Sequence, residues 1–233
     1  ILESNSKYPV FKIDLNASWF IQVHGHFLYA LSEVDQGSIN SYDLSESFSE
    51  RKPPKLVSSQ PVSGSPAHLS LSTQRGVIGL ASYSGGLVTF FKYNPNTGII
   101  QDLILKKVFE GKGPNVNRQE SPHPHEIVFS STDSMIYVPD LGTDEIHRLD
   151  ADDFFNEIAP IKVRPGYGPR HLKIVGDVML VVCELVSKIV IIKNEAVLAE
   201  YDLIDQKYFH EQSPDLIGTA AEIQILNSNI YVS

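Results

Sequence analysis

The chain has 233 residues, of which 42% are hydrophobic and 20% are charged, and its formal net charge at pH 7 is −9. This composition supports a buried core and excludes a disordered chain, while the acidic balance argues against non-specific nucleic-acid binding, which needs a basic face. No apolar run reaches about 18 residues, so we expect no membrane-spanning helix. The single cysteine, Cys183, allows no internal disulfide, and its apolar neighbours predict a buried, unreactive thiol.

Short apolar runs dominate the chain, whereas long helical periodicity is almost absent. The runs are rich in Val, Ile, Leu, Phe and Tyr, and clusters of Gly, Pro, Asn, Ser and Asp separate them. The clearest runs, in chain order, lie at residues 27–31, 88–93, 127–129, 179–182 and 188–192. The best helix candidate is short and lies at residues 152–158. These patterns predict an all-β chain.

The apolar runs recur in units that begin with a similar polar tripeptide. The tripeptides lie at residues 17–19, 66–68, 124–126, 169–171 and 220–222. Aligned at Ser18, Ala67, His125, Arg170 and Ala221, they are 49, 58, 45 and 51 residues apart. The ends of the second strands, at Glu33, Tyr83, Leu141 and Glu184, are 50, 58 and 43 residues apart. Because two independent alignments agree, a period near fifty predicts the blades of a β-propeller, with three or four strands in each.

We therefore expect a single β-propeller domain over residues 1–233, with roughly four and a half to five blades. A solenoid of stacked repeats is the alternative, but the polar tripeptides suit a central channel better. The longest step contains residues 112–119, which we interpret as an inserted loop, and residues 51–61 as a connector. The fifth unit stops at residues 231–233, in mid-blade, so we expect a domain truncated at the C-terminal and also the N-terminal end. The remainder of the ring would then be needed for closure.

Three motifs, GPN at residues 113–115, RQESPHPH at 118–125 and YVPDLGTD at 137–144, carry a family resemblance. Weaker matches are GSPAH at 64–68, SYSGG at 82–86, GPRHL at 168–172 and AAEI at 220–223. Together they resemble the seven-bladed propeller lactonases, which include bacterial-type 6-phosphogluconolactonase and fungal carboxymuconate-lactonizing enzymes. The resemblance runs from about residue 16 to the end. Pro-Asp-Gly turns common in that family are replaced here, for example by STDS at 131–134, which leaves the exact substrate open.

The resemblance implies three catalytic residues, His125, Arg170 and Glu184, plus an arginine that would follow Ser233. The residues themselves support a shared site. His125 and Arg170 hold equivalent positions in consecutive blades, so both should point to the same end of the channel, and Glu184 ends a strand of the Arg170 blade. The alternative is a structural Arg170–Glu184 ion pair with His125 capping a turn.

Opening a lactone requires an activated water, a stabilised oxyanion and a protonated leaving alkoxide. A histidine near its ordinary pKa of about 6.5 can shuttle the proton at neutral pH. The guanidinium of Arg170 offers a fixed positive fork for an oxyanion, a carboxylate or a phosphate. Glu184 would orient that arginine or act as the general base.

Four further residues are candidates for substrate binding: His123, Asp140, His171 and Tyr83. For each we also expect a structural alternative, namely a turn for His123, a turn cap for Asp140 and blade packing for Tyr83. His171 and its equivalents His68 and Glu222 lie one residue beyond the aligned positions. In a regular strand they would face the opposite way and make structural hydrogen bonds.

The sequence thus predicts a metal-independent lactone hydrolase that acts on a small anionic sugar lactone. The alternatives are a lactonizing intramolecular lyase of the carboxymuconate type and a non-catalytic binding propeller. We expect no cofactor and no metal, because calcium needs converging carboxylate and amide oxygens where this chain offers His, Arg and Ala. The partner is a small anionic lactone or carboxylate, not nucleic acid or a membrane. We expect a cytoplasmic protein; the glycosylation sequon at Asn16 matters only if it is secreted.

Overall fold

The computed structural model describes residues 18–50, 52–153, 155–203, 219–227 and 229–233. The sequon residue Asn16 and residue Arg51 of the predicted connector lie outside these ranges. Strands and turns account for most of the described chain, which confirms the all-β prediction. Neither short helix within these ranges is long and apolar enough to cross a membrane.

Within the described ranges, the strands form four four-stranded antiparallel sheets and a two-stranded sheet, each built from consecutive strands. Blade one contains β1 (Ser18–His24), β2 (Phe27–Ser32), β3 (Gln36–Asp43) and β4 (Lys55–Ser63). Blade two contains β5 (Pro66–Ser72), β6 (Val77–Ser82), β7 (Leu87–Tyr93) and β8 (Ile100–Val108). Blade three contains β9 (Val128–Phe129), β10 (Met135–Asp140), β11 (Glu145–Asp150) and β12 (Asn156–Lys162). Blade four contains β13 (Pro169–Val175), β14 (Val178–Cys183), β15 (Lys188–Lys193) and β16 (Ala196–Asp202), and β17 (Ile223–Leu226) pairs with β18 (Asn229–Val232).

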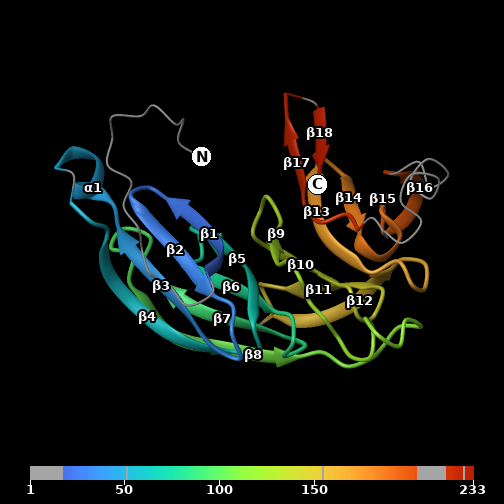
Figure 1. The fold of residues 1–233 in the computed structure, drawn as a ribbon, viewed down its shortest axis with the longest axis horizontal. Helices are drawn as coiled ribbons and strands as arrows, with labels where there is room; N and C mark the ends of the chain where they lie inside the picture. Colours follow the sequence, from blue (N-terminus) through green and yellow to red (C-terminus); the bar gives the residue numbers. More distant parts are fainter. Residues whose placement is uncertain (1–17, 51, 154, 204–218, 228) are drawn as a thin grey trace.

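The sheets follow one another around an arc (Figure 1), as expected for propeller blades. The first strands of neighbouring blades contact each other between β1 and β5, β5 and β9, and β13 and β17, so these strands lie innermost, while β13 meets blade three at β10. The blade boundaries match both sequence alignments. The predicted propeller architecture and the predicted number of blades are therefore confirmed.

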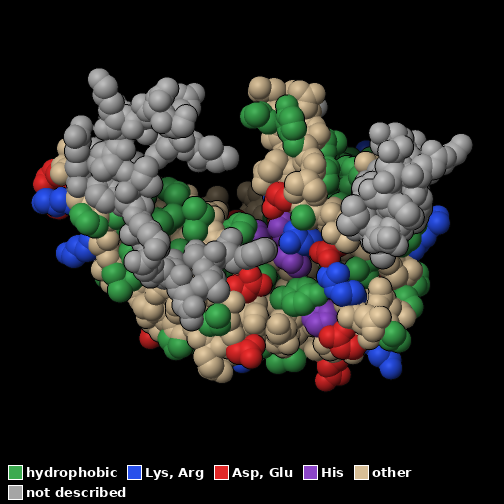
Figure 2. All heavy atoms as spheres, in the orientation of Figure 1, with side chains coloured by type: hydrophobic (Ala, Val, Ile, Leu, Met, Phe, Trp, Pro, Cys, Tyr) green, Lys and Arg blue, Asp and Glu red, His purple; other side chains and the backbone are tan. Residues whose placement is uncertain are grey.

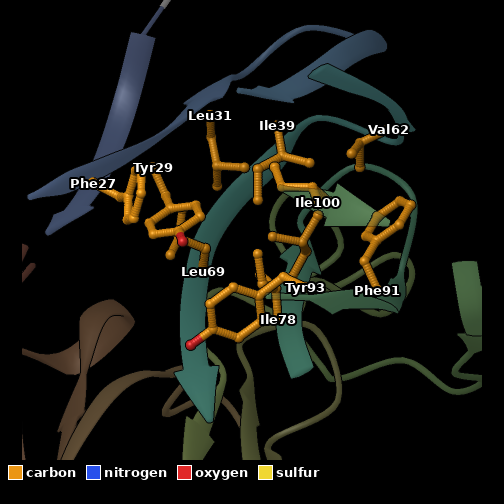
Figure 3. Packing of buried hydrophobic residues seen from close by; sticks show 11 residues of the cluster. Phe27, Tyr29, Leu31, Ile39, Val62, Leu69, Ile78, Phe91, Tyr93 and Ile100 are labelled. Carbon is orange, nitrogen blue, oxygen red and sulfur yellow. The ribbon is translucent and has the colours of Figure 1, made fainter. Parts of the chain in front are cut away.

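Apolar side chains fill the space between neighbouring blades and hold the arc together. Between blades one and two, Tyr29 and Leu31 of β2 pack with Leu69 of β5 and Ile78 of β6 (Figure 3), and all four are buried. Burying one such aliphatic side chain is worth about 1.5–3 kcal/mol. Similar clusters join blades two and three, three and four, and four and five. Each blade boundary thus contributes its own core.

The structure corrects two sequence predictions about local structure. The predicted helix at residues 152–158 is wrong: the carboxylate of Asp150 accepts hydrogen bonds from the backbone N–H groups of Asp152 and Asp153, which makes a turn, and β12 follows. The predicted connector at 51–61 is largely β4, because Lys55–Ser63 pairs with β3 at the outer edge of blade one, where a proline such as Pro61 is tolerated. No pattern in the sequence predicted the helix α1 (Ser45–Ser49).

The inserted loop is confirmed. No strand occurs between the end of β8 at Val108 and the start of β9 at Val128, and every residue of that segment is described. The loop folds back on itself, since the Gly113 N–H donates to the Gln119 carbonyl oxygen over 2.9 Å. It brings Arg118 and His125 to the inner side of the arc. A second irregular element, the 3₁₀ helix η1 (Glu184–Val186), follows β14 directly and places Glu184 beside them.

Candidate active site

Charged and imidazole side chains gather on the inner side of the arc. Figure 2 shows histidine, basic and acidic side chains together there. Arg170 lies on the innermost strand β13, Glu184 opens η1, and His125 precedes β9. His125 is held by its backbone N–H, which donates to the Pro139 carbonyl oxygen over 3.1 Å. The fold thus brings together the three residues predicted to be catalytic.

Glu184 bridges two guanidinium groups. Its Oε2 lies 2.9 Å from Nε of Arg170, and its Oε1 accepts a hydrogen bond of 2.6 Å from Nη2 of Arg118. The Arg170 Nε–H is not aligned for a hydrogen bond, so that contact is an ion pair. Nη1 of Arg170 instead donates to the Ala221 carbonyl oxygen over 2.5 Å. The predicted ion pair exists, but one carboxylate serves two arginines.

The two arginines differ in exposure. The side chain of Arg118 is 40% exposed, whereas those of Arg170 and Glu184 are each 12% exposed. Burial alone lowers the pKa of Arg118, but its interactions with Tyr83 and Glu184 outweigh this and raise the pKa overall. Arg118 therefore remains charged and offers its accessible edge to an anion, while Arg170 is fixed beneath.

His125 is neutral at pH 7. Burial lowers its pKa well below 6.5, and the charges of Arg170 and His171 lower it further. The expectation of a histidine near its ordinary pKa is therefore wrong, because the sequence could not show how close Arg170 would lie. Nδ1 of His125 is buried, and no other described residue forms a hydrogen bond with it. The ring is therefore a neutral base that its surroundings make weak.

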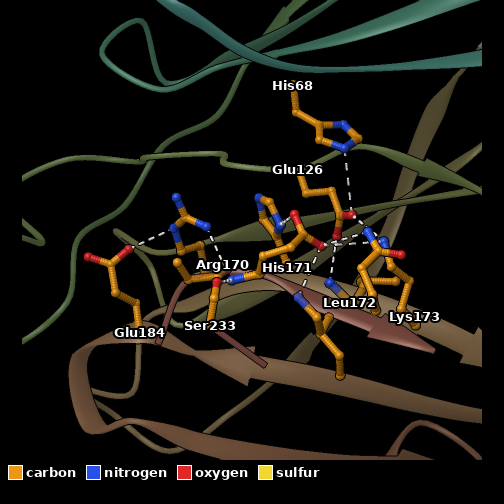
Figure 4. A network of polar contacts seen from close by, with 12 residues as sticks. His68, Glu126, Arg170, His171, Leu172, Lys173, Glu184 and Ser233 are labelled. Carbon is orange, nitrogen blue, oxygen red and sulfur yellow. Dashed lines mark hydrogen bonds and ion pairs between the residues drawn. The ribbon is translucent and has the colours of Figure 1, made fainter. Parts of the chain in front are cut away.

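A belt of buried imidazole and carboxylate groups lies beside this centre (Figure 4). Nδ1 of His171 lies 2.7 Å from Oε2 of Glu222, and Oε2 of Glu126 accepts the Leu172 N–H over 2.5 Å. Nε2 of His68 is 3.7 Å from Oε1 of Glu126. Burial lowers the pKa of His68 and raises that of Glu126. The hydrogen bond predicted for His171 is confirmed.

The orientation predicted for His171 and His68 is wrong. Their rings lie 5.7 Å apart, and the His171 ring lies 5.2 Å from the His125 ring, so all three face the same region. The cause is an irregularity in strand pairing between Pro66 and His68 and between Pro169 and His171. A bulge of this kind breaks the alternation from which the orientation was predicted. His171 is only 5% exposed, so its ring is buried beside that of His125.

Tyr83 and His123 form an aromatic wall next to His125. The Tyr83 ring stacks on the His123 ring at 4.4 Å, and it meets the His125 ring edge-on at 5.5 Å. His123 is 5% exposed, and its Nε2 lies 3.1 Å from Oε1 of Glu120. Tyr83 is half-buried and adjoins the centre, so its predicted substrate contact is geometrically possible. His123 backs Tyr83.

Asp140 does not line the site. It is fully buried, and its Oδ1 accepts the His123 and Gly142 N–H groups over 2.6 and 2.8 Å. Its Oδ2 lies 3.0 Å from Nε2 of His147. The prediction that Asp140 binds the substrate is therefore wrong, since a carboxylate with no exposed surface and both oxygens engaged cannot contact a ligand. The alternative, a turn cap, is confirmed.

Sequence reasoning missed two residues of this region. Arg118 stands in the RQESPHPH motif, which was a signal, but its contact with Glu184 spans 66 residues. His147 lies within β11, where nothing marks it in the sequence. Burial alone lowers the pKa of His147, but hydrogen bonds with Asp140 and Glu157 outweigh this and raise it to about 9. It is therefore protonated at pH 7.

Across the described ranges, no group of three or more His, Cys, Asp and Glu side chains is arranged to hold a metal ion. The residues around His125 are also unsuited to a cation, because two guanidinium groups flank the Glu184 carboxylate. That the protein works without a metal stays a prediction.

The comparisons with known proteins agree with this architecture. The family model "Lactonase, 7-bladed beta-propeller" matches residues 9–233. A Probable 6-phosphogluconolactonase of Arthroderma benhamiae is 32% identical over 152 residues, which cover 63% of this chain and 37% of that protein. A 6-phosphogluconolactonase of Bacillus subtilis is 30% identical over 148 residues, which cover 62% of this chain and 41% of that protein.

The solved structure of a periplasmic gluconolactonase of Pseudomonas aeruginosa superposes with a TM-score of 0.73 at 20% identity. The superposition covers 89% of this chain and 61% of that one. At this identity the likeness supports the fold alone. The chain spans less than half the length of the two curated relatives named above.

Proposed function

The chain belongs to the seven-bladed β-propeller lactonase family, and from this premise we propose that it carries the active site of a metal-independent lactone hydrolase. The proposed substrate is a small anionic sugar lactone of the 6-phosphogluconolactone type. The observation that carries the proposal is the pairing of a neutral imidazole, His125, with two arginines bridged by Glu184.

In the proposed reaction, His125 accepts a proton from a water whose oxygen attacks the lactone carbonyl carbon. The negative charge that develops on the carbonyl oxygen faces the guanidinium of Arg170. The ring C–O bond then breaks, and the leaving alkoxide takes the proton back from the imidazolium of His125, which yields the hydroxy acid. A low pKa makes His125 a weak base but a strong acid, which suits a reactive ester whose leaving group must be protonated.

Glu184 has a supporting part in this proposal. Both of its oxygens contact arginines, at 2.9 and 2.6 Å, so it is poorly placed to take a proton from water. It keeps two like charges side by side, which would otherwise repel. The accessible Arg118 then binds the anionic group of the substrate, while the buried Arg170 meets the carbonyl oxygen.

The test is hydrolysis of 6-phosphogluconolactone by the protein, measured above the spontaneous rate. Arg170→Ala and His125→Ala should each lower kcat/KM at least about 100-fold, the usual loss for an oxyanion donor or an acid–base group. Arg164→Ala is the matched control, because Arg164 also pairs with a glutamate, Glu200, but its side chain is 70% exposed. Its activity should match the wild type. Turnover of carboxymuconate but not of the sugar lactone would overturn the proposal in favour of a lyase, and turnover of neither would favour a binding propeller.

A further inference from the structure

We propose that residues 140–144, the end of β10 and the turn that leads to β11, are a positioning device that sets three segments of the active site relative to one another. The inference rests on the proposed function. The three segments carry Arg118, His125 and Arg170. The first two are parts of the inserted loop and the third is the approach to β13, and residues 140–144 hydrogen-bond to each of them.

Asp140 holds the loop that carries His125. Its Oδ1 accepts the backbone N–H of His123 over 2.6 Å, two residues before His125. The backbone adds two bonds of 3.1 Å, from Leu141 N–H to the His123 carbonyl oxygen and from His125 N–H to the Pro139 carbonyl oxygen. Because a carboxylate accepting from backbone N–H groups forms strong, short hydrogen bonds, His125 has little freedom to shift.

Leu141 holds the loop that carries Arg118. Its carbonyl oxygen accepts a hydrogen bond of 2.9 Å from Nε2 of Gln119, the residue next to Arg118. Gln119 is fully buried, and its Oε1 accepts the Asn115 N–H over 3.1 Å. One side chain therefore closes the tip of the inserted loop and ties it to the turn.

Asp144 holds the loop that leads into β13 and Arg170. Its Oδ2 accepts the Gly166 N–H over 2.7 Å, and its Oδ1 accepts the Gly168 N–H over 2.8 Å. Gly168 lies two residues before Arg170, and its carbonyl oxygen accepts the Glu184 N–H over 2.9 Å. Asp144 is 5% exposed, so water does not compete for these bonds. It thereby fixes both partners of the Arg170–Glu184 pair.

The turn itself has little room to move. His147 lies between Asp140 and Glu157, at 3.0 and 2.9 Å, and stacks on Phe109 at 3.8 Å. At Gly142, an added Cβ would collide with the Ser121 carbonyl oxygen and lie 2.8 Å from the His123 nitrogen. The loop of His125 therefore packs directly on the turn, and a shift of the turn would move the loops with it.

The test uses Asp144→Asn, which keeps the size of the side chain but turns one acceptor into a donor facing a backbone N–H. We expect kcat for the sugar lactone to fall about 10- to 100-fold with KM little changed, since a displacement of about 1 Å is enough for such a loss. Asp177→Asn is the matched control, because Asp177 lies in the β13–β14 turn with its side chain 67% exposed. It should leave both parameters unchanged.

A second readout does not depend on turnover. Burial lowers the pKa of His125 most and the charge of Arg170 lowers it further, so NMR titration of His125 responds to the distance between the two groups. In Asp144→Asn the pKa of His125 should move towards 6.5. If the wild type does not hydrolyse the lactone but this shift occurs, the proposed function fails and the positioning inference stands. A folded Asp144→Asn protein with wild-type kcat and an unchanged His125 titration would overturn it.

A second variant guards against failure of Asp144→Asn to fold. Gln119→Met keeps the length and removes both hydrogen bonds of the Gln119 amide, so only the loop of Arg118 is released. We expect KM for the anionic lactone to rise about 10-fold with a smaller change in kcat, because Arg118 is proposed to bind the anion. An unchanged KM in the folded variant would contradict the inference.

Discussion

The buried, protonated His147, which contacts Asp140, makes a strong prediction about how the stability of the protein depends on pH. Its pKa of about 9 lies above the ordinary 6.5, because Asp140 and Glu157 accept its two N–H groups. A group whose pKa is raised on folding stabilises the protein fully below its unfolded pKa, and this stabilisation is lost as the pH rises through the folded value. At about 1.4 kcal/mol for each pKa unit, His147 contributes at most about 3 kcal/mol, present below pH 6.5 and gone above pH 9.

The assay is urea unfolding of the wild type and of His147→Gln at intervals between pH 6 and pH 10. Other groups titrate in both proteins, so the quantity of interest is the difference in unfolding free energy. The wild type should lose about 3 kcal/mol more than the variant across this range. His26→Gln is the control, because His26 also pairs with an aspartate, at 3.8 Å, but its side chain is 52% exposed. Parallel curves for the wild type and His147→Gln would refute the reasoning.

Other features give further measurable outcomes. Gly142→Ala should destabilise the protein by more than about 2 kcal/mol in urea unfolding, since the added Cβ would collide with backbone atoms. Gly176→Ala is the control: the added Cβ would have open space, so the loss of stability should be only the roughly 1 kcal/mol that a positive φ costs a residue other than glycine. Cys183 is buried, which raises the pKa of its thiol, so it should react with a thiol reagent only after unfolding; fast labelling of the native protein would contradict its burial. The acid limb of the kcat/KM profile should have its midpoint below pH 6.5, the direction in which burial and Arg170 move the pKa of His125, and a midpoint above 6.5 would exclude His125 as the base. Excess chelator should leave lactone hydrolysis unchanged, and loss of activity would show a metal requirement.

The spacing of polar tripeptides was enough to predict the blades, because each blade is a local unit of consecutive strands. Each unit contains its own apolar runs and turn residues, so the period of about fifty residues is visible in the sequence. The same equivalence placed His125 and Arg170 in one site, since the same position in successive blades faces the same channel. The predicted helix failed for a local reason, as the Asp150 carboxylate caps a turn where a helix would begin.

The polar contacts between loops depend on distances that no pattern encodes. Arg118 meets Glu184 only because the inserted loop folds across the neighbouring blade, and Gln119 ties that loop to Leu141. Asp140 looks like a channel residue in sequence, yet its Oδ1 accepts the His123 N–H from the loop of His125 and its Oδ2 pairs with His147 of β11. The direction in which the His171 side chain points follows from an irregularity in strand pairing. The alternation of residue types in the sequence does not reveal that irregularity.

The sequence by itself determined the all-β repeat, the family and the three residues around which the site is built, because these follow from local patterns and from equivalent positions in each blade. Only the tertiary structure decided the protonation of His125 and His147, the sharing of Glu184 by two arginines and the burial of Asp140. The physical reason is that charge interactions and desolvation depend on separations of a few ångströms between groups far apart in the chain.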